Sequence, residues 1–479
     1  MPTRRPRPSG SRPRSRGSAE RVKGARDLTA GPIAPALIAF ALPALGSGVL
    51  QSLNGSINTV WIGQYLGEAA LAATTNATLV MFLLFAAVFG FGMAASILVG
   101  QSVGAKDLDG ARRVIGSATG LFAALSLLTV VAGWFGAPAL LRVLSTPADV
   151  FALALGYLRV VLLSIPASYL TVLAMMTLRG FGDSLTPLWF AILATALDLV
   201  LNPVLILGLG PAPALGIEGS GLATVISTTV GLVAMLAFIY ARDLPVRLRG
   251  GELRYLLPRG ELLRTILVKG VPMGLQMIVI SASALAMIGL VNRQGTITTA
   301  AYGAVSQLWT YVQMPAFAVG AAVSAMVAQN IGAGRWDRVG RITAIGVGIS
   351  AAATAVLVIL AFAFDDRLFR LFLPSDLAAQ AIAARFNLLS TWTLVLFSIS
   401  LVMGATMRAN GAVLGPLVIL ATAMLPVRFG FAYALEPRWG ADAIWWSFPL
   451  GSATALALTI LYYRQGGWRA ERMGPARTA

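Results

Sequence analysis

The sequence predicts an all-α integral membrane protein whose twelve transmembrane helices form two six-helix lobes related by a parallel pseudo-two-fold repeat. Three observations predict this fold. The 479 residues are 57% hydrophobic and only 11% charged, whereas soluble domains carry about 25% charged residues. Twelve apolar runs are long enough to cross a bilayer, which takes about 20 residues. Two motifs of the first half return in the second half at a nearly constant spacing.

The chain begins with a segment that differs from the rest. Residues 1–30 are rich in Arg, Pro and Ser and show no apolar periodicity, which predicts a disordered basic cytoplasmic tail. Residues 31–241 then contain six apolar runs, which we expect to form the N-lobe. The expected helices lie near 33–62, 69–102, 111–137, 149–179, 184–209 and 216–241.

A charged stretch separates the two halves. Residues 242–262 are expected to form a cytoplasmic linker, residues 263–463 the C-lobe, and residues 464–479 a second cytoplasmic tail. The expected helices of the C-lobe lie near 263–291, 299–330, 339–364, 378–407, 411–434 and 440–463.

The distribution of basic residues predicts the orientation. If both ends are cytoplasmic, the inner connections carry more Lys and Arg than the outer ones, as the positive-inside bias requires. The inner loops then hold Lys106, Arg112, Arg113, Arg179, Arg335, Arg338, Arg341 and Arg408, besides five arginines of the linker. The outer loops hold only Arg142, Arg293, Arg367, Arg370 and Arg438.

Internal repetition is the most specific signal. "GMAASILVGQSVGAKDLDGARR" begins at Gly92, and "GAAVSAMVAQNIGAGRWDRVGR" begins at Gly320. "LRGFGDSLTP" and "MRANGAVLGP" place Arg179 and Arg408 at matching positions. Six helices per repeat make both halves enter the membrane from the same side, so the repeat axis runs along the membrane normal. Two prolines near the starts of the halves keep the spacing: Pro43 and Pro272.

The composition excludes several functions. The chain has no Cys and no His, so thiolate or imidazole metal sites and Cys nucleophiles are absent, and we expect neither a metal site nor a cofactor. The formal charge of +17 does not indicate nucleic-acid binding, because the basic residues lie in tails and short loops. An intramembrane enzyme would need a paired carboxylate set or an activated nucleophile, and none is visible.

Polar residues inside the apolar runs are the candidate functional residues. Asp198 lies near the middle of its helix, where an acid costs about 2.5–3.5 kcal/mol on insertion scales. Asn202 follows at i+4, and Pro203 frees the backbone carbonyl of Leu199. Gln51, Asn54 and Asn58 share one face of the first helix. Structural alternatives remain open: a hydrogen bond to a neighbouring helix, a packing kink, and interhelical amide contacts.

Five motifs resemble the multidrug and toxic-compound extrusion (MATE) family, over residues 33–463. They are "VGQSVGAKD", "AQNIGAGRWD", "LRGFGDSLTP", "GIEGSGLATVIS" and "WIGQYLG". The sequence is similar to the DinF-like bacterial branch. The resemblance implies a twelve-helix exporter with N- and C-lobes, driven by protons or sodium, whose usual substrates are organic cations and amphipathic drugs.

The sequence departs from that branch at the ion site. The branch typically reads "VDTIWVGRYLG" where this chain reads "INTVWIGQYLG", so Asn58 stands in place of the family acid. On the fifth helix the branch often reads Asn-x-x-x-Asp, and here Asp198 and Asn202 carry these residue types in swapped order. The glutamate of the NorM-like seventh helix is missing from "VPMGLQMIVISAS".

We therefore expect an ion site made by Asp198, Asn202 and Asn58 in an N-lobe cavity. The resemblance implies that residues matching Gln51 and Asn58 line the drug chamber, and Asn54 and Thr224 are further candidates for binding substrate. The predicted function is a proton- or sodium-coupled antiporter for amphipathic or cationic drugs and toxic compounds. We expect a monomer in a bacterial inner membrane, in contact with lipid and with a small drug-like substrate. The alternatives are a lipid-linked precursor flippase of the same superfamily and a passive channel.

Overall fold

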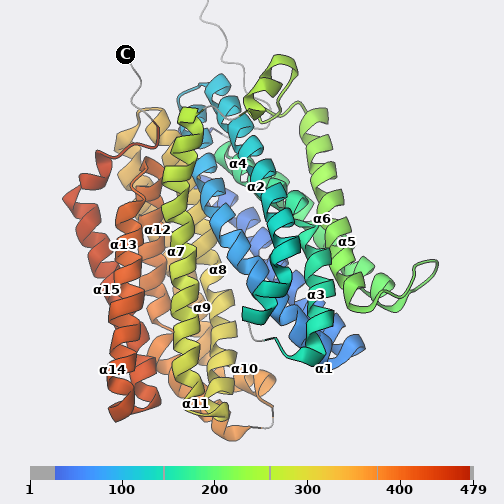
Figure 1. The fold of residues 1–479 in the computed structure, drawn as a ribbon. Helices are drawn as coiled ribbons and strands as arrows, with labels where there is room; N and C mark the ends of the chain where they lie inside the picture. Colours follow the sequence, from blue (N-terminus) through green and yellow to red (C-terminus); the bar gives the residue numbers. More distant parts are fainter. Residues whose placement is uncertain (1–26, 144–145, 258–259, 375, 475–479) are drawn as a thin grey trace, which may run out of the picture.

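The structure is a computed structural model that describes residues 27–143, 146–257, 260–374 and 376–474. Most of the expected N-terminal tail, residues 1–26, lies outside the described residues. Within them the chain is all-helical, and Figure 1 shows two bundles side by side, one for each half of the sequence. Eleven helices are long and apolar enough to cross a membrane, and a bent pair brings the number to twelve, which confirms the predicted fold.

The N-lobe begins with a 72-residue helix, α1, that contains two candidate spans. The two spans meet at Gly67, whose φ of 79° lies in the left-handed region that glycine tolerates best. This break separates the helices expected near 33–62 and 69–102. The helices of the lobe are α1 (Ile33–Gly104), α2 (Leu108–Val143), α3 (Ala148–Leu162), α4 (Ile165–Gly180), α5 (Leu185–Leu207) and α6 (Gly216–Ala241).

One N-lobe prediction is wrong in detail. The single helix expected over 149–179 is a pair, α3 and α4, that meets at an angle of 47°. Pro166 lies in the first turn of α4, where proline is tolerated because it has no backbone N–H to donate to the preceding turn. The two helices together make one broken span.

The C-lobe follows the same plan with more breaks. Its helices are α7 (Gly260–Asn292), α8 (Thr296–Gly332), α9 (Trp336–Ala363), α10 (Asp365–Phe372), α11 (Leu377–Ser390), α12 (Thr393–Asn410), α13 (Leu414–Thr422), α14 (Gly430–Trp439) and α15 (Ala441–Gln465). The single helix expected over 378–407 is wrong, because a turn at Thr391 and Trp392 divides it into α11 and α12. A π-helical stretch, Ala423–Phe429, joins α13 to α14.

The connecting segments are docked onto the lobes. In the linker, Arg112 of α2 pairs with Glu252 at 2.8 Å, and Tyr255 packs so closely on α2 that Gly116 has no space for a side chain. Residues at both ends of the described chain are also held: Leu28 is 1% exposed and Trp468 is 1% exposed. The backbone carbonyl of Leu28 accepts a hydrogen bond from Asn330 at 3.0 Å.

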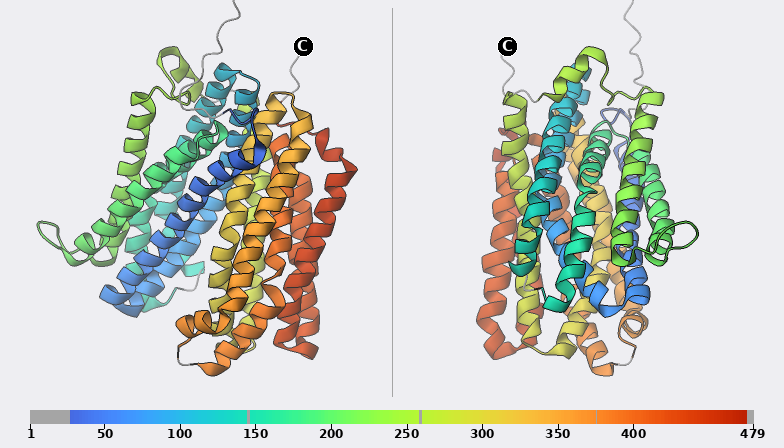
Figure 2. Two further views of the ribbon diagram at one scale, coloured as in Figure 1. Left: turned by 180° about the vertical axis from the view of Figure 1, so that it is seen from behind. Right: turned by 45° about the vertical axis from the view of Figure 1, so that its right-hand side comes forward.

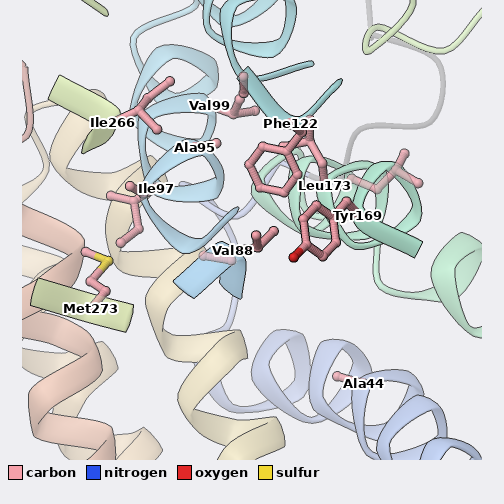
Figure 3. Packing of buried hydrophobic residues seen from close by; sticks show 14 of the residues in the cluster. Ala44, Val88, Ala95, Ile97, Val99, Phe122, Tyr169, Leu173, Ile266 and Met273 are labelled. Carbon is pink, nitrogen blue, oxygen red and sulfur yellow. The ribbon is translucent and has the colours of Figure 1, made fainter. Parts of the chain in front are cut away.

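The second half of α1 occupies the centre of the molecule. Figure 3 shows Phe122 of α2 and Leu173 and Tyr169 of α4 on one side of it, and Ile266 and Met273 of α7 on the other side. All of these side chains belong to one buried cluster that includes residues of both lobes. The two lobes are therefore packed against each other through α1, α7 and α8.

The repeat motifs form a reciprocal contact between the lobes. Gln101 of α1 donates a hydrogen bond to the carbonyl of Ala409 at 2.8 Å, and Gln329 of α8 donates to the carbonyl of Gly180 at 3.0 Å. A side chain on Gly104 would lie 1.9 Å from the carbonyl oxygen of Gln329, and one on Gly332 would lie 1.9 Å from that of Gln101.

We call this contact the interlobe clasp. It is formed by Gln101, Gly104 and Gly180 of the N-lobe and by Gln329, Gly332 and Ala409 of the C-lobe. It lies at the end of the molecule where the described termini lie, and the two bundles diverge toward the opposite end (Figure 2). The lobes are therefore in contact at the clasp on the side of the termini, and their helices diverge toward the other side.

Candidate functional site

Asp198 lies in a buried polar cluster between α5 and α6. Its side chain is 1% exposed, and its Oδ1 accepts hydrogen bonds from the hydroxyls of Thr224 at 3.3 Å and Ser227 at 3.1 Å. Its second oxygen, Oδ2, has no hydrogen-bond partner among the described residues. A buried carboxylate with one free oxygen is costly unless it binds a proton or a cation.

Asn202 connects the acid to α1. It is fully buried, and its Nδ2 donates to the side-chain oxygen of Asn58 at 3.0 Å and to the backbone carbonyl of Asp198 at 3.0 Å. Its own side-chain oxygen has no hydrogen-bond partner within the described part of the chain. Pro203 follows it within α5 and cannot donate to the carbonyl of Leu199. The cluster thus presents several uncharged oxygens close to one carboxylate.

The structure brings together five of the six predicted site residues. Asp198, Asn202, Asn58 and Thr224 are joined by hydrogen bonds, and the side chains of Asn58 and Asn54 both lie close to the Asp198 carboxylate. Gln51 lies on α1 with Asn54 and Asn58, but its side chain is exposed and is not part of this hydrogen-bonded group.

Two further residues belong to the site but were not predicted. Ser227 lies one turn after Thr224 on α6 and donates to Asp198; the i, i+3 spacing in "TVIS" was a signal for it. Tyr157 of α3 lies within electrostatic reach of Asp198. It lies on a third helix, so no local pattern in the sequence indicates it.

The predicted substrate-binding residues do not line a large cavity here. A cavity of about 330 Å³ lies nearby and is lined by Ser56, Ile57, Val60, Trp61, Gln64 and Leu199. These residues come from α1 and α5, the same two helices that carry the amide stripe and Asp198. Of the three amides on that face of α1, Asn54 and Asn58 lie near Asp198, and Gln51 does not.

The cluster suits a proton or one small monovalent cation. Its donor set is a single carboxylate with amide, hydroxyl and backbone oxygens, which is how membrane transporters commonly hold coupling ions. In the part of the chain that the structure describes, no group of three or more His, Cys, Asp or Glu side chains is close enough to hold a metal ion together.

Comparison with known proteins decides the family. The model of the MatE family matches the chain twice, over residues 43–204 and 272–434, once in each lobe. The chain belongs to the MATE family. Both matches begin at the prolines, Pro43 and Pro272, that mark the internal repeat. The placement in the DinF-like branch stays a prediction.

Two relatives of this MATE protein, both named as probable multidrug resistance proteins, match it over nearly their whole length. It is 36% identical to the probable multidrug resistance protein YoeA of Bacillus subtilis, over 89% of this chain and 92% of that protein. It is 25% identical to the probable multidrug resistance protein NorM of Thermotoga maritima, over 91% and 93% of the two chains.

Solved structures agree with the fold. A structure described as the outward-facing conformation of a multidrug resistance MATE family transporter of the MOP superfamily matches with a TM-score of 0.85 at 20% identity. The match covers 92% of this chain and 97% of that one. This likeness shows the fold, and the family match together with the candidate spans shows a multi-pass membrane protein of the MATE family.

Proposed function

We propose that this transporter is a proton- or sodium-coupled antiporter that exports amphipathic or cationic drugs and toxic compounds by alternating access of its two lobes. The observation that supports the proposal most strongly is the buried carboxylate of Asp198: its Oδ2 has no hydrogen-bond partner, and no Lys or Arg side chain of the described residues forms an ion pair with it. The relatives named above support the substrate class. Their names indicate no lipid-linked precursor, so these relatives give the flippase alternative no support.

Coupling follows from competition for one negative charge. When the lobes are open opposite the termini, H⁺ or Na⁺ binds Asp198 and neutralises the cluster. Substrate is then released, because a cationic substrate and the ion both need the same carboxylate. After the lobes rearrange, the ion leaves on the other side and a new substrate binds. The transporter needs no resident cofactor, and each monomer contains the complete site.

Export of ethidium from bacterial cells tests this function. Cells that express the transporter should hold ethidium below its external concentration, because export runs against the substrate gradient. The difference should disappear when a protonophore, or a sodium ionophore, collapses the coupling gradient. Equal internal and external ethidium before either ionophore is added would identify a passive channel instead.

We expect both termini to face the cytoplasm of a bacterial inner membrane. The clasp, the linker and both described chain ends lie on one side of the structure (Figure 1), and this side carries most of the loop arginines. An epitope tag at residue 1 or residue 479 should be inaccessible to antibody in intact cells and accessible after permeabilisation. Labelling of either tag in intact cells would contradict the orientation.

Restoring the family acid should change the pH dependence of export. In Asn58→Asp, a second carboxylate joins the Asp198 cluster, and two carboxylates so close together hold a shared proton more tightly. The optimum of export should move to higher pH. Asn58→Leu should instead weaken substrate binding, because it removes an amide from the cluster and leaves the Asn202 amide with only the backbone carbonyl of Asp198 as acceptor. Superimposed pH profiles with equal substrate affinity for all three proteins would show that Asn58 serves only helix packing.

A further inference from the structure

A second cavity, separate from the Asp198 cluster, lies between the two lobes. Its volume is about 310 Å³, and its walls come from α1 and α4 of the N-lobe and α7, α8, α12, α13 and α15 of the C-lobe. Most of the lining is apolar and includes the flexible side chains of Met93, Met176, Met273 and Met277 and the ring of Phe317. Methionine-rich walls adapt to ligands of differing shape.

The charged residues of this cavity are all positive. Arg179 of α4 and Arg408 of α12 line it, and its lining contains no Asp or Glu. Neither arginine forms an ion pair with any described residue. The Nε atoms of both are shielded from solvent and have no hydrogen-bond partner. Two unpaired guanidinium groups at one apolar cavity are costly unless an anion accompanies them.

The internal repeat brings the two arginines together. Arg179 and Arg408 occupy matching positions in "LRGFGDSLTP" and "MRANGAVLGP", and each lies in the last turn of its helix. The next residues, Gly180 and Ala409, are the carbonyl acceptors of the interlobe clasp. When the clasp is closed, one guanidinium group from each lobe therefore lines the same cavity.

Gln276 of α7 adds a third donor. Its side chain is 6% exposed, and its Oε1 accepts a hydrogen bond from Nη1 of Arg408 at 3.2 Å. This contact fixes the direction of the amide, so that Nε2 is the free donor, and Nε2 has no partner among the described residues. Gln276 also lines the cavity. A nearly buried amide that can only donate favours an anionic ligand.

We propose that this cavity binds an amphipathic anion. Arg179, Arg408 and Gln276 hold its phosphate or other oxyanion head group, and the methionine and phenylalanine wall covers its apolar body. Guanidinium groups suit this task because their N–H donors match the geometry of oxyanions. The transporter then has two sites of opposite charge: an acidic site for the coupling ion and cationic substrate, and a basic site between the lobes for an organic anion.

The probes for a test are two molecules with the same aromatic body and opposite charge, 1-naphthyl phosphate and (1-naphthylmethyl)trimethylammonium. Their binding is measured by titration calorimetry on the full chain in nanodiscs of zwitterionic lipid. Wild type should bind the phosphate. Arg179→Gln and Arg408→Gln should each weaken that binding about tenfold or more, as expected for loss of a charge-assisted hydrogen bond. Arg179→Lys and Arg408→Lys should each lose less affinity for the phosphate than the Gln variants, because the positive charge remains.

Controls separate the anion site from folding and from the proposed drug site. Arg385→Gln removes an exposed arginine, which pairs with Asp442 outside this cavity, and should leave phosphate binding unchanged. The ammonium probe should not lose affinity in the Arg179 and Arg408 variants. If either arginine variant fails to fold, Gln276→Leu, which removes the free amide donor and keeps both charges, should still weaken phosphate binding several-fold.

Nanodiscs that contain phosphatidic acid identify the source of the anion. The measurement is made at an ionic strength that screens the charge of the disc surface. Weaker binding of naphthyl phosphate than in zwitterionic nanodiscs would show that a lipid head group competes for the cavity. Equal binding in the two kinds of nanodisc would indicate a soluble organic phosphate. Equal phosphate affinity in wild type and both arginine variants would overturn the proposal. That result would leave the ion-coupled export of cations untouched.

Discussion

Asp198→Asn should reduce export of a cationic substrate to the level of cells that lack the transporter. The carboxylate is the only acidic side chain in the α5–α6 cluster, and an asparagine there can neither take up H⁺ nor hold Na⁺ with a negative charge. The substitution removes the charge that ion and substrate compete for. The measurement is ethidium efflux from cells that express equal amounts of wild type and variant.

The folded structure should tolerate this change. An asparagine oxygen can still accept the hydrogen bonds that Thr224 and Ser227 donate, so the melting temperature of the purified variant should stay close to that of wild type. Asp149→Asn, at an exposed position in the first turn of α3, is the matched control and should export normally. Wild-type export by Asp198→Asn would show that the acid is structural.

Gly104→Ala and Gly332→Ala should prevent the lobes from closing on the side of the termini. Each added methyl group would lie 1.9 Å from a backbone carbonyl oxygen of the other lobe, and backbone atoms cannot give way as a flexible side chain can. Each lobe on its own should be unaffected. The variants should therefore favour the opposite state, in which the clasp is open, and their transport should be strongly reduced.

The absence of cysteine makes this shift directly measurable. Spin labels on Ala105→Cys and Ala333→Cys, two exposed positions at the ends of α1 and α8, report the distance across the clasp without background labelling. Double electron–electron resonance should give a longer mean distance in either glycine variant. Gly136→Ala, where a methyl group meets nothing within 4 Å, should leave the distance unchanged. An unchanged distance in Gly104→Ala would mean that the clasp does not define the closed state.

The number of helices and the repeat were predictable because they depend on local chemistry. A run of about 20 apolar residues predicts a span, and the paired motifs around Gly92 and Gly320 predict two related lobes. Where helices break was harder to predict. The turn that separates α11 from α12 at Thr391 has no Gly or Pro beside it, and there the tertiary fold, with Asn387 and Trp309 both bonded to the Thr391 hydroxyl, decides the boundary.

The candidate site was partly predictable for a similar reason. Asp198 and Asn202 are four residues apart, so one helix presents both, and a mid-membrane acid is rare enough to stand out. Asn58 was a candidate because it shares one helix face with Gln51 and Asn54, and its assignment to the ion site required the family resemblance. Ser227 and Tyr157 come from other helices, and their approach depends on packing angles that the sequence does not specify.

The basic cavity could not be predicted from the distribution of basic residues along the sequence. Arg179 and Arg408 were assigned to inner loops because they lie at the ends of apolar runs. In the structure they belong to the last turns of α4 and α12 and line the space between the lobes. The repeat signalled that the two positions are equivalent, but equivalence does not say whether a side chain points to the surface or to the partner lobe.

The most direct test of the central claim, ion-coupled antiport through Asp198, is transport in proteoliposomes with the pH gradient and the sodium gradient imposed separately. Wild type should accumulate ethidium against its own gradient when one of the two is applied, and Asp198→Asn should only equilibrate it or not move it at all. Equal accumulation by both proteins would contradict the role of Asp198. Simple equilibration by wild type under either gradient would contradict coupled antiport itself.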